Sequence, residues 1–512
     1  MNPGDNSRIA KNTALLYVRM LIVMAINIWT VRLVLKALGV EDYGIFNVVA
    51  GVVTMIQSVS GVLSSATQRF YSFYIGKGEQ LQLTKIFSVS VNIFLAVSLF
   101  VFVVGESLGV WFINNYLSIP PERLSTAIWV FHFSLLSVIF LLLQTPFSGA
   151  VVSHEDMNLF AVISLAECVL KFLLAWWLTK VSYDRLFLYG AGLMLISLAV
   201  WMSYFIIVRL RYKPFRYRRY KYEGKLYKEL LSFSGWIFVG SMAGLSINQL
   251  CTILVNMFFG PIVNAARAIS FQVSNVINSF SASFLMAIRP PMIKSYAQED
   301  YHFLNTLFSL SNKFIYYSLL IICIPLYFWM EPLLDVWLHT TDPDTVLFSR
   351  LMLVYVFVLS LGNPITYIIY ATGNVKQYHV LVEIPTLLCA PLTYIAFKLG
   401  SPAYSTYIIL IVCVIISHIL RLVSLKKYYR HFDLRDYIFS FLIPAFLITT
   451  VTIPLVGYID TLFSSNIQRL MAIVIVSLFC LGGMGFFFGL SSIERGFIRN
   501  KVSAFVKRYK AI

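Results

Sequence analysis

Charged residues are scarce in this sequence. Only 12% of its 512 residues are Asp, Glu, Lys or Arg, whereas 59% are hydrophobic and the mean hydropathy is +0.78. A soluble globular protein has about 25% charged residues, so the composition excludes that class, and it equally excludes a disordered chain or a collagen. Cysteine is rare too. The six cysteines lie far apart inside apolar runs without a CxxC pair, which favours small packing residues over disulfides or metal ligands.

Long polar stretches are also missing. Apolar runs that can cross a hydrocarbon core of about 30 Å recur along the chain and leave no room for a sizeable soluble domain. The first run contains arginines and lacks a small-residue cleavage site, so we expect no cleaved signal peptide. We predict an all-α, polytopic membrane protein with about 14 transmembrane helices. They are expected near residues 12–38, 45–67, 86–104, 125–147, 157–179, 186–208, 231–258, 266–288, 313–330, 346–371, 378–398, 404–424, 438–458 and 468–490.

The basic residues indicate how the chain crosses the membrane. Lys and Arg outnumber Asp and Glu by 40 to 23, which gives a net charge of +17. With a cytoplasmic N-terminus, 29 of the 40 fall in inward-facing segments and 8, Arg267 among them, in outward-facing segments. This asymmetry predicts that both termini are cytoplasmic. The basic stretch Arg209–Lys228 and the amphipathic tail 491–512 are expected to lie against anionic lipid headgroups, so we predict no nucleic-acid partner.

The chain contains an internal repeat at an offset of about 221 residues. The first expected span ends at Leu38-Gly39, and the seventh ends at Phe259-Gly260. The span after each carries a stripe of small and polar residues, which includes Gln57 in the first half and Asn275 and Asn278 in the second. Polar side chains on an embedded helix face other helices or water. The stripes therefore serve either helix packing or a shared central cavity, and their repetition favours the cavity.

Two parallel six-helix repeats are typical of a transporter. The expected domains are an N-terminal six-helix bundle (1–208), a basic cytoplasmic linker (209–230), a C-terminal six-helix bundle (231–424), two extra helices (425–490) and a basic amphipathic cytoplasmic tail (491–512).

The costly charged residues of the expected spans are Arg19, Arg32, Glu167, Lys171 and Glu383, and each charge costs about 2.5–3.5 kcal/mol unless it is paired or hydrated. Glu167 and Lys171 are four residues apart and can pair with each other, or they can take part in ion coupling. Arg19 and Arg32 lie near the ends of their span, where they can reach the interface or line a cationic cavity that binds phosphate. Glu383 has no basic partner within its span, so it is the stronger candidate for binding H⁺ or Na⁺.

The histidines give no sign of a metal or a catalytic site. His132 and His418 are single histidines within expected spans, and we interpret them as buried, neutral and hydrogen-bonded. The adjacent residues His154, Glu155 and Asp156 cannot easily converge on one ion, so they are interpreted as a solvated turn. We predict no metal, no cofactor and no catalytic residue.

Three segments resemble one family of transporters. VRLVLKALGVEDYGIFNVVAGVV (31–53) resembles the first loop of the polysaccharide flippases, where an R-xx-L-xx-LG-xxx-YG pattern links spans 1 and 2. TPFSGAVVSHEDMNLFAVISLAECVLK (145–171) and YATGNVKQYH (370–379) resemble their corresponding turns in the two halves. The chain therefore resembles a flippase of the O-antigen and capsule type, within the multidrug/oligosaccharidyl-lipid/polysaccharide exporter (MOP) superfamily.

This resemblance implies a function and a location. The protein would move an undecaprenyl-pyrophosphate-linked oligosaccharide across the bacterial inner membrane, from the cytoplasmic to the periplasmic leaflet, by alternating access. It would act with the phospholipid bilayer, with H⁺ or Na⁺ as coupling ion, and with polysaccharide assembly proteins. Cavity cations of the family are thought to receive the sugar–pyrophosphate headgroup, and Arg32 lies in the matching motif.

Two other functions stay open. A cation-coupled multidrug exporter of the same fold would depend more on acidic cavity residues than on basic ones. A membrane-embedded polysaccharide polymerase or ligase would need an outward loop to hold an acceptor sugar, yet the longest such loops expected, 105–124 and 331–345, show no acid–base pair. We therefore predict a transporter and not an enzyme.

Overall fold

The computed structural model describes residues 3–116, 120–218, 220, 223–338, 342–463, 465–489 and 495. Within these residues the chain forms helices and no strand, which confirms the all-α fold class. The tail 491–512, expected to be an amphipathic helix, lies outside the described residues apart from Arg495.

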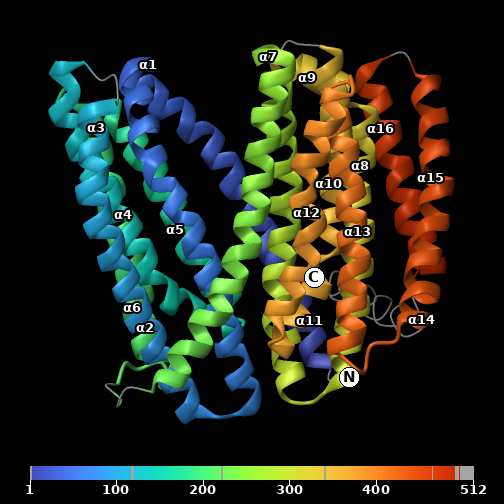
Figure 1. Ribbon diagram of the computed structural model, residues 1–512, viewed down its shortest axis with the longest axis horizontal. Coiled ribbons are helices and arrows are strands. Elements are labelled where there is room, and N and C mark those ends of the chain that lie inside the picture. The colour runs from blue at the N-terminus through green and yellow to red at the C-terminus, as the bar shows by residue number, and fades with distance from the viewer. Residues whose placement is uncertain are drawn as a thin grey trace, which may run out of the picture. The chain divides into compact units, whose positions relative to one another are not determined.

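The helices follow one another with short turns (Figure 1). The first eight elements are α1 (Pro3–Lys77), α2 (Gln80–Val104), η1 (Gly105–Gly109), α3 (Val110–Tyr116), α4 (Pro121–Ser153), α5 (Met157–Leu178), α6 (Arg185–Arg211) and α7 (Gly224–Ala297). The next are α8 (Tyr301–Phe328), α9 (Met330–Leu338), α10 (Pro343–Leu361), α11 (Asn363–Thr372), α12 (Val375–Lys398) and α13 (Ser405–Tyr428). The last are α14 (Leu434–Tyr437), η2 (Ile438–Leu442), α15 (Ile443–Leu462), α16 (Asn466–Ser477) and η3 (Leu478–Gly489). The three η segments are π-helical.

Two helices are far too long for a single crossing. α1 has 75 residues and α7 has 74, so either would measure about 110 Å if it were straight. Each instead bends at one glycine with positive φ, Gly39 in α1 and Gly260 in α7. Both helices accordingly appear in Figure 1 as pairs of rods. The two bends fall at the ends of the first and seventh spans, as the sequence predicts.

Among the residues that the structure describes, twelve helical segments are long and apolar enough to cross a membrane. The second halves of α1 and α7, Val40–Lys77 and Pro261–Ala297, are not among them. The half 261–297 carries one of the polar stripes, which lowers its apolar content. The expected count of fourteen is therefore not confirmed, although both segments are helical.

The chain forms two compact units. Unit 1 comprises Met1–Val239 and Met286–Asp300, and unit 2 comprises Gly240–Leu285 and Tyr301–Ile512. The domain boundaries expected from the sequence stay a prediction.

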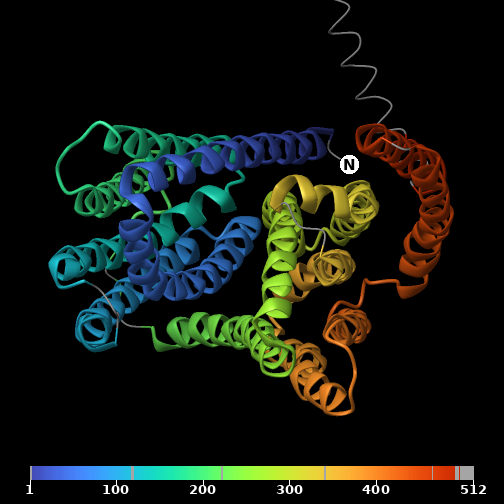
Figure 2. The ribbon, with the colours of Figure 1, turned by 90° about the horizontal axis from the view of Figure 1, so that it is seen from above.

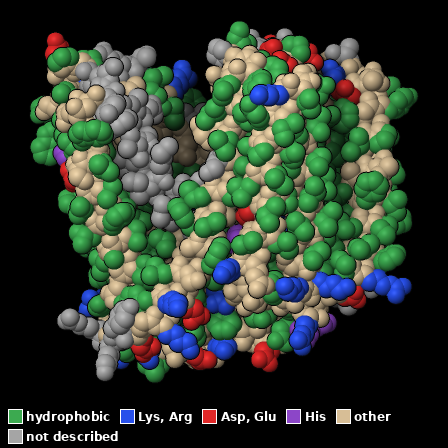
Figure 3. Space-filling model, viewed as in Figure 1, with side chains coloured by type: hydrophobic (Ala, Val, Ile, Leu, Met, Phe, Trp, Pro, Cys, Tyr) green, Lys and Arg blue, Asp and Glu red, His purple; other side chains and the backbone are tan. Residues whose placement is uncertain are grey.

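Each unit has its own apolar core. Figure 2 shows many of the helices end-on. In unit 1, Phe94 and Val101 of α2 pack with Leu135 and Val138 of α4. In unit 2, Ile247 and Cys251 of α7 pack with residues of α12 and α13, and α15 and α16 pack against each other and α8. The helix surfaces visible in Figure 3 are largely hydrophobic along their middle, as expected for helices surrounded by lipid.

The two long outward loops expected from the sequence are wrong. The segment 105–124 continues as helix through η1 and α3 to Tyr116, and α9 occupies Met330–Leu338 of the segment 331–345. Glu106, within this helical stretch, is paired: its Oε1 lies 2.9 Å from Nδ1 of His132 on α4. A charged residue with a partner does not have to end a helix within a membrane.

The basic linker, which the sequence predicts to lie against lipid headgroups, packs against helix α2. Tyr217 Oη donates to Asn92 Oδ1 at 3.1 Å, and the Arg218 backbone N–H donates to Ser88 Oγ at 3.1 Å. Lys85 Nζ pairs with Glu223 Oε1 at 2.7 Å. These contacts bind the linker to α2 within unit 1.

Candidate functional site

The second half of α7 presents exposed polar side chains at helical spacing. Gln272, Asn275, Asn278 and Ser279 are exposed, and the helix is long enough to cross a membrane. Asn278 Nδ2 donates to Ser274 Oγ at 3.2 Å, and Ser279 Oγ donates to the backbone oxygen of Asn275 at 2.8 Å. The Asn275 side chain makes no hydrogen bond among the described residues. An exposed amide is costly against lipid, so this stripe is suited to water or a polar ligand.

The matching stripe of the first half is described only in part. The side chain of Gln57 lies outside the described residues, so its role stays a prediction. Closer to the C-terminal end of the same helix, Gln68 Nε2 donates to Ser64 Oγ at 3.1 Å, and the hydroxyl oxygens of Ser60 and Thr145 lie 3.3 Å apart. Here the polar residues bind each other and α4, which is the helix-packing use of such a stripe.

The two arginines of the first span have different environments. Arg19 is half-buried: its Nε donates to Ser164 Oγ of α5, and its guanidinium lies 4.9 Å from the ring centre of Phe160. Arg32 is exposed, and its guanidinium lies 5.9 Å from the Trp29 ring. Arg32 makes no ion pair among the described residues, so most of its hydrogen-bond donors remain available for a ligand.

Glu167 and Lys171 form the ion pair that their spacing predicts. Lys171 Nζ lies 2.6 Å from Glu167 Oε1, and both side chains are partly exposed. Both lie on α5, the helix that also holds Ser164 and therefore Arg19. The pair leaves one net positive charge on this part of unit 1, that of Arg19.

The expectation that Glu383 lacks a basic partner in its span is wrong. Glu383 Oε1 lies 3.5 Å from Nδ1 of His379, one helical turn earlier on α12, and His379 is buried. The other ring nitrogen of His379 lies 3.3 Å from the hydroxyl of Tyr370 on α11. Gly240 of α7 makes room for this ring, because a Cβ there would lie 2.3 Å from His379 Nδ1. The spacing of four residues was the signal, and it was visible in the sequence.

The other two histidines do not match their interpretation fully. His132 is paired with Glu106, as described above. His418 is enclosed, but neither of its ring nitrogens has a hydrogen-bond partner among the described residues. The expectation that His418 is hydrogen-bonded is therefore wrong.

The sequence interpretation of the turn between α4 and α5 as solvated is wrong. The Glu155 side chain is only 9% exposed, and its two oxygens pair with Arg8 at 3.0 Å and Lys294 at 2.6 Å. Asp156 caps α5 and pairs with Arg211 at 3.1 Å. The partners come from segments far away in sequence, which local spacing could not reveal.

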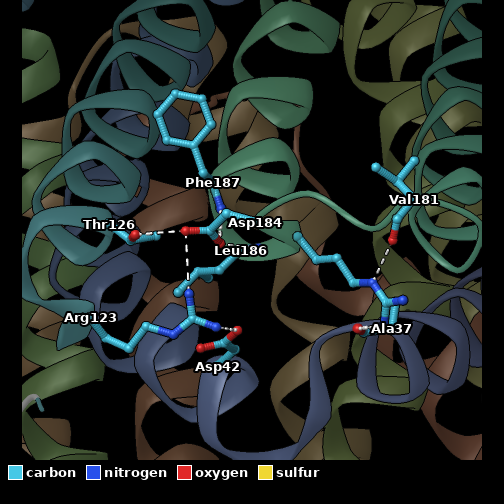
Figure 4. A network of polar contacts seen from close by, with 9 residues as sticks. Ala37, Asp42, Arg123, Thr126, Val181, Asp184, Leu186 and Phe187 are labelled. Atoms are coloured by element: carbon cyan, nitrogen blue, oxygen red, sulfur yellow. Dashed lines mark hydrogen bonds and ion pairs between the residues drawn. The ribbon is translucent and has the colours of Figure 1, made fainter.

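Sequence reasoning also missed a polar network at the other end of unit 1 (Figure 4). Arg123 lies between two carboxylates, with Nη2 2.8 Å from Asp42 Oδ2 and Nη1 3.3 Å from Asp184 Oδ2. Thr126 Oγ1 donates to the same Asp184 oxygen at 2.8 Å, and Arg185 Nη1 donates to the backbone oxygen of Ala37 at 2.9 Å. The network binds the bend of α1 to α4 and α6.

Arg267, which the count of basic residues assigns to an outward-facing segment, is fully buried. Its Nε donates to Thr252 Oγ1 at 3.1 Å, and its guanidinium lies over the rings of Phe271 and Tyr407, at 4.9 and 5.4 Å. Two aromatic faces and hydroxyl groups accommodate a cation without a carboxylate. Unit 2 therefore holds this cation within its own core.

The fold of the chain occurs in solved transporters. It superposes on an outward-facing multidrug resistance MATE family transporter of the MOP superfamily with a TM-score of 0.71 at 13% identity, over 83% of this chain and 97% of that one. It also resembles a MOP superfamily transporter from Pyrococcus furiosus, titled for the reverse polarity of its binding pocket. That TM-score is 0.68 at 12% identity, over 82% and 95% of the two chains. The chain has the MATE fold.

One similar sequence has no described function. The chain is 22% identical over 395 residues, 74% of each protein, to the "Uncharacterized membrane protein EpsK" of Bacillus subtilis (strain 168). No family model matches the sequence.

Among the proteins with the MATE fold, the transporter ClbM was solved in complex with Rb⁺. It matches this chain with a TM-score of 0.68 at 14% identity, over 82% of this chain and 96% of its own. In the part of this chain that is described, His, Cys, Asp and Glu form no group of three or more that could hold a metal ion.

Proposed function

We propose that this protein is a transporter that moves a lipid-linked oligosaccharide from the cytoplasmic to the outer leaflet of a bacterial inner membrane. The observation that carries this proposal is the stripe of exposed polar side chains along the second half of α7, Gln272 to Ser279. A sugar headgroup needs many hydrogen bonds during its passage, and amides such as Asn275 and Asn278 offer both donors and acceptors.

The basic residues of the first span support a phosphate-bearing substrate. A guanidinium binds phosphate through paired donors and stays charged at any physiological pH. Arg32 is exposed and has only a ring contact, and Arg19 has one hydroxyl and one ring as its contacts. We propose that these two arginines and the amides Gln57, Asn275 and Asn278 receive the pyrophosphate–sugar headgroup during alternating access.

The orientation and the partners belong to the same proposal. The excess of Lys and Arg on one side supports cytoplasmic termini. A transporter of this kind receives its substrate from the enzymes that assemble the oligosaccharide on its lipid carrier, and it has no catalytic residue of its own.

The test uses the full chain in proteoliposomes. A fluorescent polyprenyl-pyrophosphate disaccharide is placed in both leaflets, and an impermeant reductant then measures how fast the inner pool becomes accessible. We expect the wild type to flip this lipid and Arg32→Glu to lose most of the activity. The matched control is Lys398→Glu, because Lys398 is also exposed and also lies over one ring, that of Tyr394 at 5.1 Å.

Two different results would contradict the role of the arginines and the proposed substrate class. Flipping at the wild-type rate in both Arg19→Glu and Arg32→Glu would remove these residues from the site. Failure of the wild type to flip any polyprenyl pyrophosphate would overturn the substrate class.

A multidrug exporter is the second candidate, and the pair His379–Glu383 favours it, because an acidic residue within a span can exchange a proton for a cationic drug. Export of an organic cation driven by a pH gradient, without flipping of the lipid, would support this function instead.

A further inference from the structure

The last turns of α7 are fastened to unit 1 by several kinds of contact. Met286 and Ala287 pack with Leu16 of α1 and with residues of α4 and α5. Arg289 donates to the side chain and the backbone oxygen of Ser65 in α1. Further along, α7 lies so close to Gly76 of α1 that a Cβ there would come within 2.8 Å of the backbone of Lys294. The segment Met286–Asp300 therefore belongs to unit 1, whereas the residues before it, from Gly240 on, belong to unit 2.

Glu155 in the α4–α5 turn makes the ionic part of this attachment. One carboxylate oxygen lies 2.6 Å from Lys294 Nζ of α7, and the other lies 3.0 Å from Arg8 Nη2 of α1. Arg8 also donates to the backbone oxygen of His154 at 3.0 Å, and Asn12 Nδ2 donates to that of Glu155 at 3.2 Å. One carboxylate thus holds α1, the turn and the end of α7 together.

Glu155 has a backbone conformation that is unusual for a residue with a side chain. Glu155 has φ 61°, in the left-handed region that favours glycine. The corresponding turn between α11 and α12 has a glycine at this position, Gly373, with φ 82°. A glutamate in place of glycine costs conformational energy. The chain accepts this cost at a site where the carboxylate binds two cations.

The turn between α7 and α8 provides a natural comparison. Gln298-Glu299-Asp300 repeats the pattern of His154-Glu155-Asp156, and Glu299 has φ 60°. The backbone hydrogen bonds are equivalent as well: the N–H of Glu299 donates three residues back at 3.2 Å, as that of Glu155 does at 2.9 Å. The Glu299 side chain, however, is exposed and makes no ion pair with any described residue.

We propose that Glu155 is a releasable ionic latch, which holds the end of α7 on unit 1 and has to open when the transporter changes conformation. The proposal rests on the alternating access suggested above, because α7 continues from unit 2 into this attachment. Ion pairs suit a contact that opens and closes, since water solvates both charges once they separate. An apolar contact of the same size would expose its surface to water on opening.

The latch is tested by the accessibility of one buried residue on the attached segment. Ser295 is 3% exposed and lies one residue after Lys294, so Ser295→Cys places a thiol beneath the attachment. The six native cysteines are all buried and give the background. The purified full chain in nanodiscs is treated with a maleimide, and the rate of labelling is measured by mass spectrometry. No substrate is needed, so the result is independent of what the protein transports.

Glu155→Gly is the decisive variant, because glycine suits the left-handed backbone and the substitution removes the side chain with its carboxylate. We expect the thiol introduced by Ser295→Cys to be labelled about ten times faster when Glu155→Gly is added, which corresponds to the loss of a charged hydrogen bond. Glu299→Gly is the matched control, with the same residue, the same kind of backbone and no ion pair, and it should leave the rate unchanged. Ser417→Cys, 1% exposed in α13, should stay unlabelled in all variants and so excludes general unfolding.

Two further variants show whether the charge itself is responsible. Lys294→Gln should accelerate labelling as Glu155→Gly does. The double variant should be no faster than the faster single one, because each single variant already lacks the Glu155–Lys294 contact. Lys294→Arg should restore slow labelling. Equal labelling rates in Glu155→Gly and Glu299→Gly would overturn the latch, whatever the outcome of the lipid-flipping assay.

Discussion

Gly39 and Gly260 have the same backbone conformation at the bends of the two longest helices. Gly39 has φ 78° and ψ 173°, and Gly260 has φ 82° and ψ −177°. This combination is essentially restricted to glycine, because a Cβ would collide with the neighbouring backbone. Each bend divides one long helix into two helical segments, and the same local conformation occurs in both halves of the repeat.

Replacing either glycine by alanine should therefore destabilise the protein through its backbone alone. No atom beyond the adjacent residues lies within 4 Å of a Cβ built on Gly39 or Gly260, so packing is not disturbed. We expect Gly260→Ala to lower the free energy of unfolding by about 1–3 kcal/mol, measured as the apparent melting temperature in detergent. Gly235→Ala, at a helical position of α7 that is equally open, should be neutral or slightly stabilising. Equal melting temperatures in the two variants would contradict the strain.

The pair His379–Glu383 predicts a proton-dependent activity. Glu383→Gln keeps the shape of the side chain but cannot release a proton, so transport should lose its response to a pH gradient. The measurement compares flipping by wild-type and Glu383→Gln proteoliposomes with and without the gradient. Wild-type transport that ignores collapse of the gradient would count against any ion coupling at this site.

Gly240→Ala should disturb the same pair from the opposite side. The new Cβ would come within 2.3 Å of His379 Nδ1, so the ring must move away from its present position. We expect a reduced response to the pH gradient and a stability loss of about 1–3 kcal/mol from overpacking. Gly244→Ala, one turn further along α7 in open space, is the control and should behave as the wild type.

Local patterns in the sequence were sufficient for some features of this molecule. The Leu-Gly and Phe-Gly ends of spans 1 and 7 marked the two bends, and the spacing of Glu167 and Lys171 marked their ion pair. These features depend on neighbours along one helix. The pair His379–Glu383 has the same spacing of four residues, so the sequence already contains the signal for it.

Other features depend on where the helices meet, which spacing does not encode. Glu155 reaches Lys294 of α7, and Arg123 reaches Asp42 in α1 and Asp184 before α6. A count of charges could assign such residues to a side of the membrane but could not choose their partners. For the same reason the sequence assigns Arg267 to an outward-facing segment but does not reveal the rings of two helices that lie against its guanidinium.

His154 should make the stability of unit 1 sensitive to acid. It lies between α4 and α5, where burial lowers the pKa of its imidazole below the ordinary value of 6.5. Lys294 lowers this pKa further, whereas Asp156, Glu155 and the hydrogen bond from the ring to the Ala150 backbone oxygen, 2.9 Å, raise it. The ring also stacks on Tyr212, with 4.3 Å between ring centres. Burial is the largest of these influences, so the folded protein holds His154 in its neutral form.

The sign of the effect follows from the two pKa values. Above pH 6.5 the imidazole is neutral in both the folded and the unfolded chain, so its titration has no effect on stability. As the pH falls below 6.5, the unfolded chain takes up the proton first, and the folded state loses stability relative to it. His154→Gln removes this titration and places at the turn the residue that Gln298 provides in the equivalent turn. We therefore expect the melting temperature of the wild type to fall more than that of His154→Gln between about pH 8 and pH 5. The difference should be about 2 °C for each kcal/mol of unfolding free energy that the wild type loses. Parallel pH profiles for the two proteins would mean that His154 is protonated in the folded state as readily as in the unfolded one.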